Sequence, residues 1–191
     1  MAKTLHVVSI LDRSGSMTGS EVEVINAYNS FIEEQVKLSK KEKVNIKATL
    51  VLFDHTVKTV YKKVAVESVE KLTSDVYLIG GMTALYDAVG KTINEFSDKK
   101  RVIFFIETDG YENASTEFSS AGIRKLVEEK TKAGWDFNFV GADLDKATTQ
   151  SMGATLGVDS SKTMAFAKTT EGYSSRNASF TLATSAYLKN S

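Results

Sequence analysis

Three long apolar segments that alternate with amphipathic stretches constrain the fold of this chain most strongly. Residues 5–11, 46–53 and 101–108 are mostly apolar, and the last contains the unbroken run Val102-Ile103-Phe104-Phe105-Ile106. Runs of this length with little polar alternation are typical of strands that are buried on both faces. Residues 137–141 are a further candidate strand. The pattern therefore predicts a sheet that is covered on both sides.

The segments between these strands predict the covering layers. Apolar side chains recur at three- and four-residue spacing in residues 22–36, 85–96 and 123–127, which is typical of amphipathic helices. The short link 54–56 joins the second strand to residues 57–61 and favours one antiparallel hairpin. Strands that alternate with helices indicate an α/β fold with a mostly parallel sheet and helices on both faces.

Length and composition fit a single domain over residues 1–191. A chain of 191 residues with 42% hydrophobic and 25% charged residues can bury a sizeable core and is not disordered. We place the core at about residues 5–160. The remaining segment, 161–191, is Ser/Thr-rich with spaced apolar residues, and we expect it to be a C-terminal covering helical segment.

Charge and cysteine content exclude several classes of function. Lys plus Arg number 24 and Asp plus Glu number 24, so the chain has no net positive charge that would attract nucleic acid or an anionic membrane. The absence of cysteine excludes disulfides, thiolate zinc sites and cysteine nucleophiles. The first apolar run is too short to span a membrane and lacks a cleavage pattern, so we expect a cytoplasmic location.

Oxygen-bearing side chains gather where predicted elements begin and end. Asp12, Ser14 and Ser16 follow the first strand, Asp109 follows the 101–108 strand, and Thr83 precedes a helix. Carboxyl ends of parallel strands meet at one edge of a sheet, where open α/β sheets bind ligands. Two carboxylates and three hydroxyls are hard donors, which favour Mg²⁺, Ca²⁺ or Mn²⁺ over zinc or copper.

This order of motifs resembles the von Willebrand factor A (vWA) domain and its metal-ion-dependent adhesion site (MIDAS). The match consists of Asp-x-Ser-x-Ser at Asp12, Ser14 and Ser16, then Thr83, then Asp-Gly at Asp109, with all five positions filled. One such motif alone is a weak signal, whereas three in order at predicted element boundaries are a strong one. The resemblance covers roughly residues 5–160.

The resemblance implies both a fold and a ligand set. It implies a Rossmann-like, six-stranded sheet with one antiparallel edge strand. Ser14 and Ser16 would ligate Mg²⁺, with Mn²⁺ or Ca²⁺ as alternatives, and Thr83 would join them in the ligand-occupied state. Asp12 and Asp109 would bind directly or through water. An Asp or Glu side chain of a protein partner would complete the shell.

The residues in and around these motifs resemble those of prokaryotic and phage members of the family. The stretches 11–17 and 83–88 carry that likeness. Met82 stands where many members have a smaller residue, which leaves the metal set intact and could shape its rim.

Simpler interpretations exist for individual residues. Asp12, Ser14 and Thr83 could be turn or helix-cap residues, since Ser, Thr and Asp are favoured caps. Asp87 fits a first-turn helix acid. Asp143 and Asp145 suggest a second metal site, although loop acids or caps explain them better.

These residues predict a non-catalytic, metal-dependent protein-binding module. The alternatives are a metal-independent vWA scaffold and a Mg²⁺-dependent phosphohydrolase. Phosphohydrolases with an Asp after the first strand usually carry a second Asp two residues later, where Ser14 stands here. The sequence also lacks Gly-x-Ser-x-Gly, Gly-x-Gly-x-x-Gly and phosphate-loop motifs, so we expect no enzymatic activity.

Overall fold

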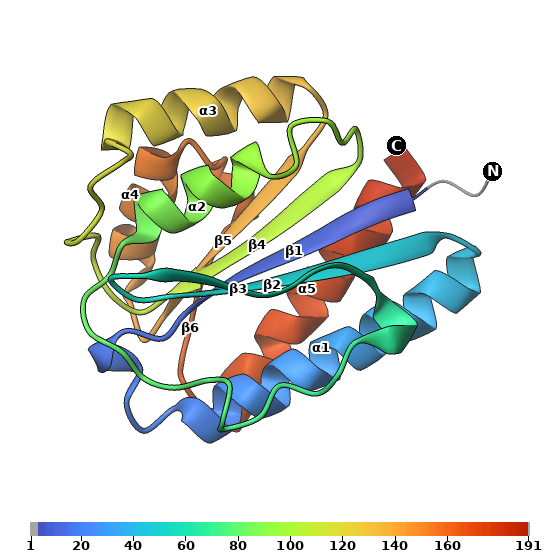
Figure 1. Cartoon of the computed structure of the whole chain (residues 1–191), viewed down its shortest axis with the longest axis horizontal. Helices are drawn as coiled ribbons and strands as arrows, with labels where there is room; N and C mark the ends of the chain where they lie inside the picture. Colours follow the sequence, from blue (N-terminus) through green and yellow to red (C-terminus); the bar gives the residue numbers. More distant parts are fainter. Residues whose placement is uncertain (1–3, 191) are drawn as a thin grey trace.

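The computed structural model describes residues 4–190 and shows a mixed sheet between two layers of helices (Figure 1). The strand order is β3-β2-β1-β4-β5-β6, in which the edge strand β3 is antiparallel to β2 and every other pair is parallel. The strands are β1 (Thr4–Asp12), β2 (Asn45–Phe53), β3 (Val57–Ala65), β4 (Val102–Thr108), β5 (Asp136–Ala142) and β6 (Thr163–Phe166). The helices are α1 (Glu21–Glu42), α2 (Leu85–Asn94), α3 (Ser120–Lys132), α4 (Lys146–Leu156) and α5 (Thr170–Asn190).

The central strands β1, β2 and β4 are buried on both faces, as the apolar runs predict. Helices α1 and α5 cover one face and α2, α3 and α4 the other (Figure 1). Successive side chains of the central strand β1 alternate between two cores: Val7 belongs to the cluster that contains Phe31 of α1, and Val8 to the cluster that contains Leu85 of α2. The predicted fold class, a single α/β domain with one antiparallel edge strand, is confirmed.

The C-terminal segment differs from our expectation of a helical cover over 161–191. Residues Thr163–Phe166 form β6, which pairs in parallel with β5, and the long helix α5 begins only at Thr170. A strand of four residues offers too few positions for an alternating pattern to stand out. Met164 and Phe166 of this strand also fit into a helical pattern, so the spacing alone did not separate the two structures.

Helix α5 is held to the sheet by a buried ion pair. Arg176 donates a hydrogen bond to Glu107 of β4, and each side chain is 1% exposed. The guanidinium also lies 5.5 Å and 5.0 Å from the ring centres of Tyr173 and Phe180. Asn177 adds a hydrogen bond of 2.8 Å to the Ala27 carbonyl of α1. No helix within residues 4–190 is long and apolar enough to cross a membrane.

Candidate metal centre

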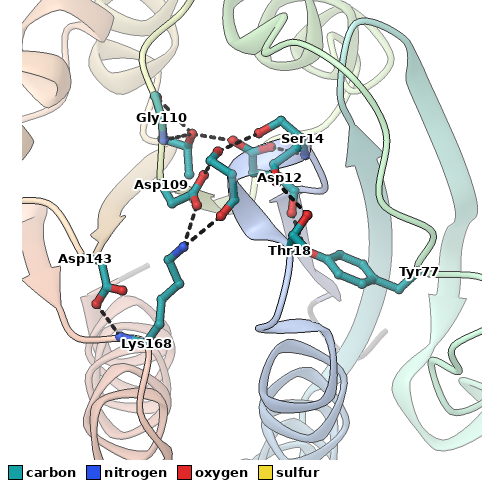
Figure 2. A network of polar contacts seen from close by, with 11 residues as sticks. Asp12, Ser14, Thr18, Tyr77, Asp109, Gly110, Asp143 and Lys168 are labelled. Carbon is teal, nitrogen blue, oxygen red and sulfur yellow. Dashed lines mark hydrogen bonds and ion pairs between the residues drawn. The ribbon is translucent and has the colours of Figure 1, made fainter.

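The five predicted ligands lie at one edge of the sheet, where β1 and β4 end side by side. Asp12 is the last residue of β1 and Asp109 directly follows β4, and these strands are paired in parallel. Ser14 and Ser16 lie in the single-turn 3-10 helix region after β1, and Thr83 precedes α2. The segments that follow β1 and β4 thus present their polar side chains to one small volume (Figure 2).

Hydroxyls and one carboxylate form the outer part of this cluster. Ser16 Oγ donates a hydrogen bond of 2.5 Å to Asp109 Oδ1 and lies 3.2 Å from Ser14 Oγ. A methyl group placed on Gly110 would lie 3.4 Å from Ser16 Oγ and 3.6 Å from Thr83 Oγ1. The Thr83 hydroxyl therefore borders the same glycine as Ser16, and the structure brings all five residues together.

Asp12 forms the inner part of the cluster and is fully buried. Its Oδ1 accepts the Ser14 backbone N–H at 2.6 Å, and its Oδ2 accepts the Thr108 hydroxyl. Burial raises the pKa of Asp12 to about 6, the nearby Asp109 charge adds to the rise, and the bonds from Thr108 and Ser14 oppose it. Both carboxylate oxygens have protein partners, so Asp12 orients the Ser14 turn from behind.

Thr83 is positioned by the loop that follows Asp109. The Thr83 N–H donates to Asn113 Oδ1 at 2.8 Å, and the Asn113 N–H donates to the Thr83 carbonyl at 3.0 Å. The Glu112 carboxylate accepts the Tyr86 N–H at 2.9 Å in the first turn of α2. The helix start is thereby capped by this loop, because its own N-cap, Ala84, has no side-chain acceptor.

Two glycines allow the segment ahead of Thr83 to approach the Ser14 turn. The Gly80 N–H donates to the Arg13 carbonyl at 2.7 Å, and the Gly15 N–H donates to the Gly81 carbonyl at 2.9 Å. A methyl group on Gly80 would lie 1.7 Å from Asp54 Oδ2, so no larger residue fits there without movement. This close approach holds two of the three site segments together.

The donor set fits a small, hard divalent cation. Adjacent oxygens around an octahedral ion with bonds of 2.0–2.1 Å are about 2.9 Å apart, and the two serine hydroxyls lie 3.2 Å apart. Within residues 4–190, no three His, Cys, Asp or Glu side chains form a metal site by themselves. Cation binding here therefore requires the hydroxyls of Ser14, Ser16 and Thr83, and their role as ligands stays a prediction.

The other acids have structural roles. Asp87, in the first turn of α2, accepts backbone N–H groups of residues 116–118 at 2.9–3.0 Å. Asp145 caps α4 through the Thr148 N–H at 2.9 Å. Asp143 accepts the Lys168 N–H at 2.7 Å. These contacts agree with the helix-acid and cap interpretations.

Sequence reasoning missed several residues that shape the centre. Thr108, Glu112 and Asn113 lie within four positions of Asp109, so their proximity to the motif is a usable signal. Lys168 is different: its Nζ donates to Asp109 Oδ2 at 2.6 Å and to the Ser16 carbonyl at 3.1 Å. It is 59 residues from Asp109 in sequence, and no local pattern points to it.

Comparison with solved structures identifies the architecture. The vWF domain of the type V pili tip protein Mfa5 from Porphyromonas gingivalis matches with a TM-score of 0.69 over 96% of this chain and 97% of that domain, at 10% identity. The chain has the fold of a vWA domain. No family model and no curated protein matches the sequence, so the likeness is one of structure.

Two further structural matches come from longer proteins. The pilus adhesin SpaC from Lactobacillus rhamnosus GG, in its open conformation, has a TM-score of 0.74 and 11% identity, over 99% of this chain and 30% of SpaC. Proximal thread matrix protein 1 from the mussel byssus, solved with zinc in its MIDAS motif, has a TM-score of 0.60 and 18% identity, over 93% and 46%. This chain thus spans less than half the length of either protein.

Proposed function

We propose that this chain is a non-catalytic binding module in which a divalent cation, Mg²⁺ in the first place, recruits an acidic side chain of a protein partner. Ser14, Ser16 and Thr83 would hold the cation, with Asp12 and Asp109 bound directly or through water. The observation that carries the proposal is the convergence of three hydroxyls and two carboxylates on one volume at the sheet edge.

The charges of this cluster explain why an outside carboxylate would bind. Asp12 has both oxygens engaged by protein donors, and Asp109 Oδ1 accepts the Ser16 hydroxyl. If both carboxylates contact the ion only through water, its neutral hydroxyl ligands leave most of its charge uncompensated. A bound cation supplies an electrophilic position that attracts a carboxylate from outside.

The surroundings of the centre suit a protein partner. Met82 is 58% exposed beside Thr83, and Tyr111 is 64% exposed beside Gly110. Exposed large apolar side chains next to a polar centre are typical of interaction surfaces, because a partner removes them from water. We therefore expect the partner to present an acidic residue with apolar neighbours.

A metal titration tests the first half of this proposal. We expect Mg²⁺ or Mn²⁺ to bind the chelator-stripped protein in calorimetry and binding to be lost in Asp109→Asn. The matched control is Asp98→Asn, which makes the same change at an exposed acid paired with Lys99. Binding in the control and its loss in the site variant support the centre; equal binding in both variants contradicts it.

Peptide binding tests the second half. In a peptide array, spots with a central Glu and apolar flanks should bind the protein in MgCl₂, whereas matched Gln spots should not. Met82→Ser should weaken this binding, and the control Leu182→Ser, at an exposed position on α5, should not. Binding that persists in chelator would instead favour a metal-independent scaffold, for which the Lys168–Asp109 ion pair is the supporting observation.

The positions of the two histidines fit the proposed non-catalytic role. Within residues 4–190, neither His6 nor His55 hydrogen-bonds a serine or threonine hydroxyl. His6 is buried in β1 against Phe96, and His55 contacts Asp54 in the hairpin turn. A hydrolytic site that used a histidine base would need that histidine within hydrogen-bonding reach of its nucleophile.

A further inference from the structure

A lysine from outside the predicted motifs occupies the mouth of the candidate centre. Lys168 lies between β6 and α5, and its ammonium contacts Asp109 Oδ2 at 2.6 Å and the Ser16 carbonyl at 3.1 Å (Figure 2). Its side chain is only 13% exposed, and Asp109 is 2% exposed. The Lys168 ammonium therefore neutralises one of the two carboxylates on which metal binding relies.

We propose that Lys168 is an internal competitor for the metal: its ammonium must leave Asp109 before a divalent cation can bind, so Lys168 sets the metal affinity of the centre. This inference rests on the proposed function. It concerns this lysine alone and predicts that the centre binds its metal less tightly than the five ligands would without Lys168.

The charges around Asp109 support competition. Asp109 has two oxygens, of which Oδ1 accepts the Ser16 hydroxyl and Oδ2 the Lys168 ammonium. An incoming divalent ion at the hydroxyls would face a positive charge at hydrogen-bonding distance from the same carboxylate. Like charges this close repel, and the repulsion is larger here than in bulk water because both side chains of the ion pair are largely buried.

The anchoring of Lys168 allows its side chain to leave without unfolding its segment. The Lys168 N–H donates to Asp143 Oδ1 at 2.7 Å, and the Asp143 N–H donates to the Phe166 carbonyl at 2.7 Å. These bonds hold the backbone independently of the ammonium. The flexible four-carbon stem can then rotate toward solvent while the backbone stays in place.

Variants at Lys168 test the competition directly. We expect Lys168→Met to bind Mg²⁺ roughly ten-fold more tightly than the parent chain, because the repulsion between the two cations is removed. Lys168→Arg keeps the charge and should keep the parent affinity. The matched control is Lys162→Met, which removes a lysine whose ion pair with Asp136, at 2.8 Å, lies away from the centre.

The outcomes separate this inference from the proposed function. Tighter binding in Lys168→Met alone supports competition. Equal or weaker binding in Lys168→Met, with binding in the parent, overturns the inference and leaves the metal centre intact. No Mg²⁺ or Mn²⁺ binding in the parent and in every variant overturns both.

A second measurement needs no variant. The parent chain is acetylated with an amine-reactive ester, with and without saturating MgCl₂, and each lysine is followed by mass spectrometry. The acetylation rate of Lys168 should rise at least about five-fold in Mg²⁺, since a side chain released from its ion pair is exposed, and its deprotonated amine can then attack the ester. The rate of Lys162 should not change. A Lys168 rate that is unaffected by saturating Mg²⁺ overturns the inference.

Discussion

Replacement of Arg176 by Met should destabilise this domain more than any change to its surface ion pairs. Arg176 and Glu107 are each 1% exposed, so the variant leaves a buried carboxylate without its partner cation. Removal of one member of a buried ion pair costs about 3–5 kcal/mol of folding free energy. The two rings beside the guanidinium also lose their contact with it. For a domain of this size, we expect the melting temperature to fall by roughly 10 °C.

The double variant Glu107→Leu with Arg176→Met sharpens the test. Glu107 Oε1 and Arg176 Nε have no hydrogen-bond partner among residues 4–190, so the pair does not satisfy all of its buried polar atoms. Apolar replacement of both members removes the unpaired charge, and such replacement of a buried ion pair is often neutral. The double variant should therefore be more stable than Arg176→Met alone.

Chemical denaturation with urea, followed by circular dichroism, measures these differences. The control is Arg124→Met, which breaks an exposed pair with Glu128 on α3 and should cost less than about 0.5 kcal/mol. A loss of less than about 1 kcal/mol in Arg176→Met would refute the reasoning from burial. So would a double variant that is less stable than either single variant.

Two further predictions concern the site loop and the pH dependence of stability. Gly80→Ala should lower the free energy of unfolding by about 2 kcal/mol or more and abolish Mg²⁺ binding, because the added methyl group meets the Asp54 carboxylate. Gly15→Ala should be tolerated, since its methyl group would have contacts of 3.6–3.8 Å. Thermal melts and calorimetry of both variants check this. Burial, with the charges of nearby lysines, lowers the pKa of His6 to about 4 from 6.5, so the stability that neutral His6 contributes is present above pH 6.5 and is lost as the pH falls toward 4. Between pH 7 and 5 this loss of stability is about 2 kcal/mol. Asp12 titrates in the same range, but its raised pKa makes the fold more stable as the pH falls. The difference in urea stability between the parent and His6→Phe therefore isolates the contribution of His6. Parallel stability curves for the parent and His6→Phe would contradict it.

The sheet could be predicted from sequence where a strand is so fully buried that its residues form a continuous apolar run. Every residue of β4 is buried, so its apolar run identifies a central strand without further information. The short strand β6 had no such signal, because three of its four residues are only partly buried and its place depends on pairing with β5. Strand pairing over a long sequence separation is a tertiary property that local periodicity does not contain.

The residues of the candidate centre also separate into those that the sequence predicts and those that it does not. Asp12, Ser14 and Ser16 lie within five residues, so their spacing is visible in the sequence, and Asp109 is marked by the strand that precedes it. Lys168 and Arg176 act on β4 and its end from the far end of the chain. Their roles depend on where α5 docks, which follows from the packing of whole elements.

The buried pair between β4 and α5 also has a consequence for synthesis of the chain. Glu107 is made 69 residues before Arg176, so on the ribosome the central strand exists well before its partner cation. A carboxylate that is buried without a partner opposes compaction, and α5 also supplies Phe180 to the core on that face. The domain therefore completes its fold when the last helix arrives, and a nascent chain arrested before residue 176 should be digested by protease far faster than the released protein.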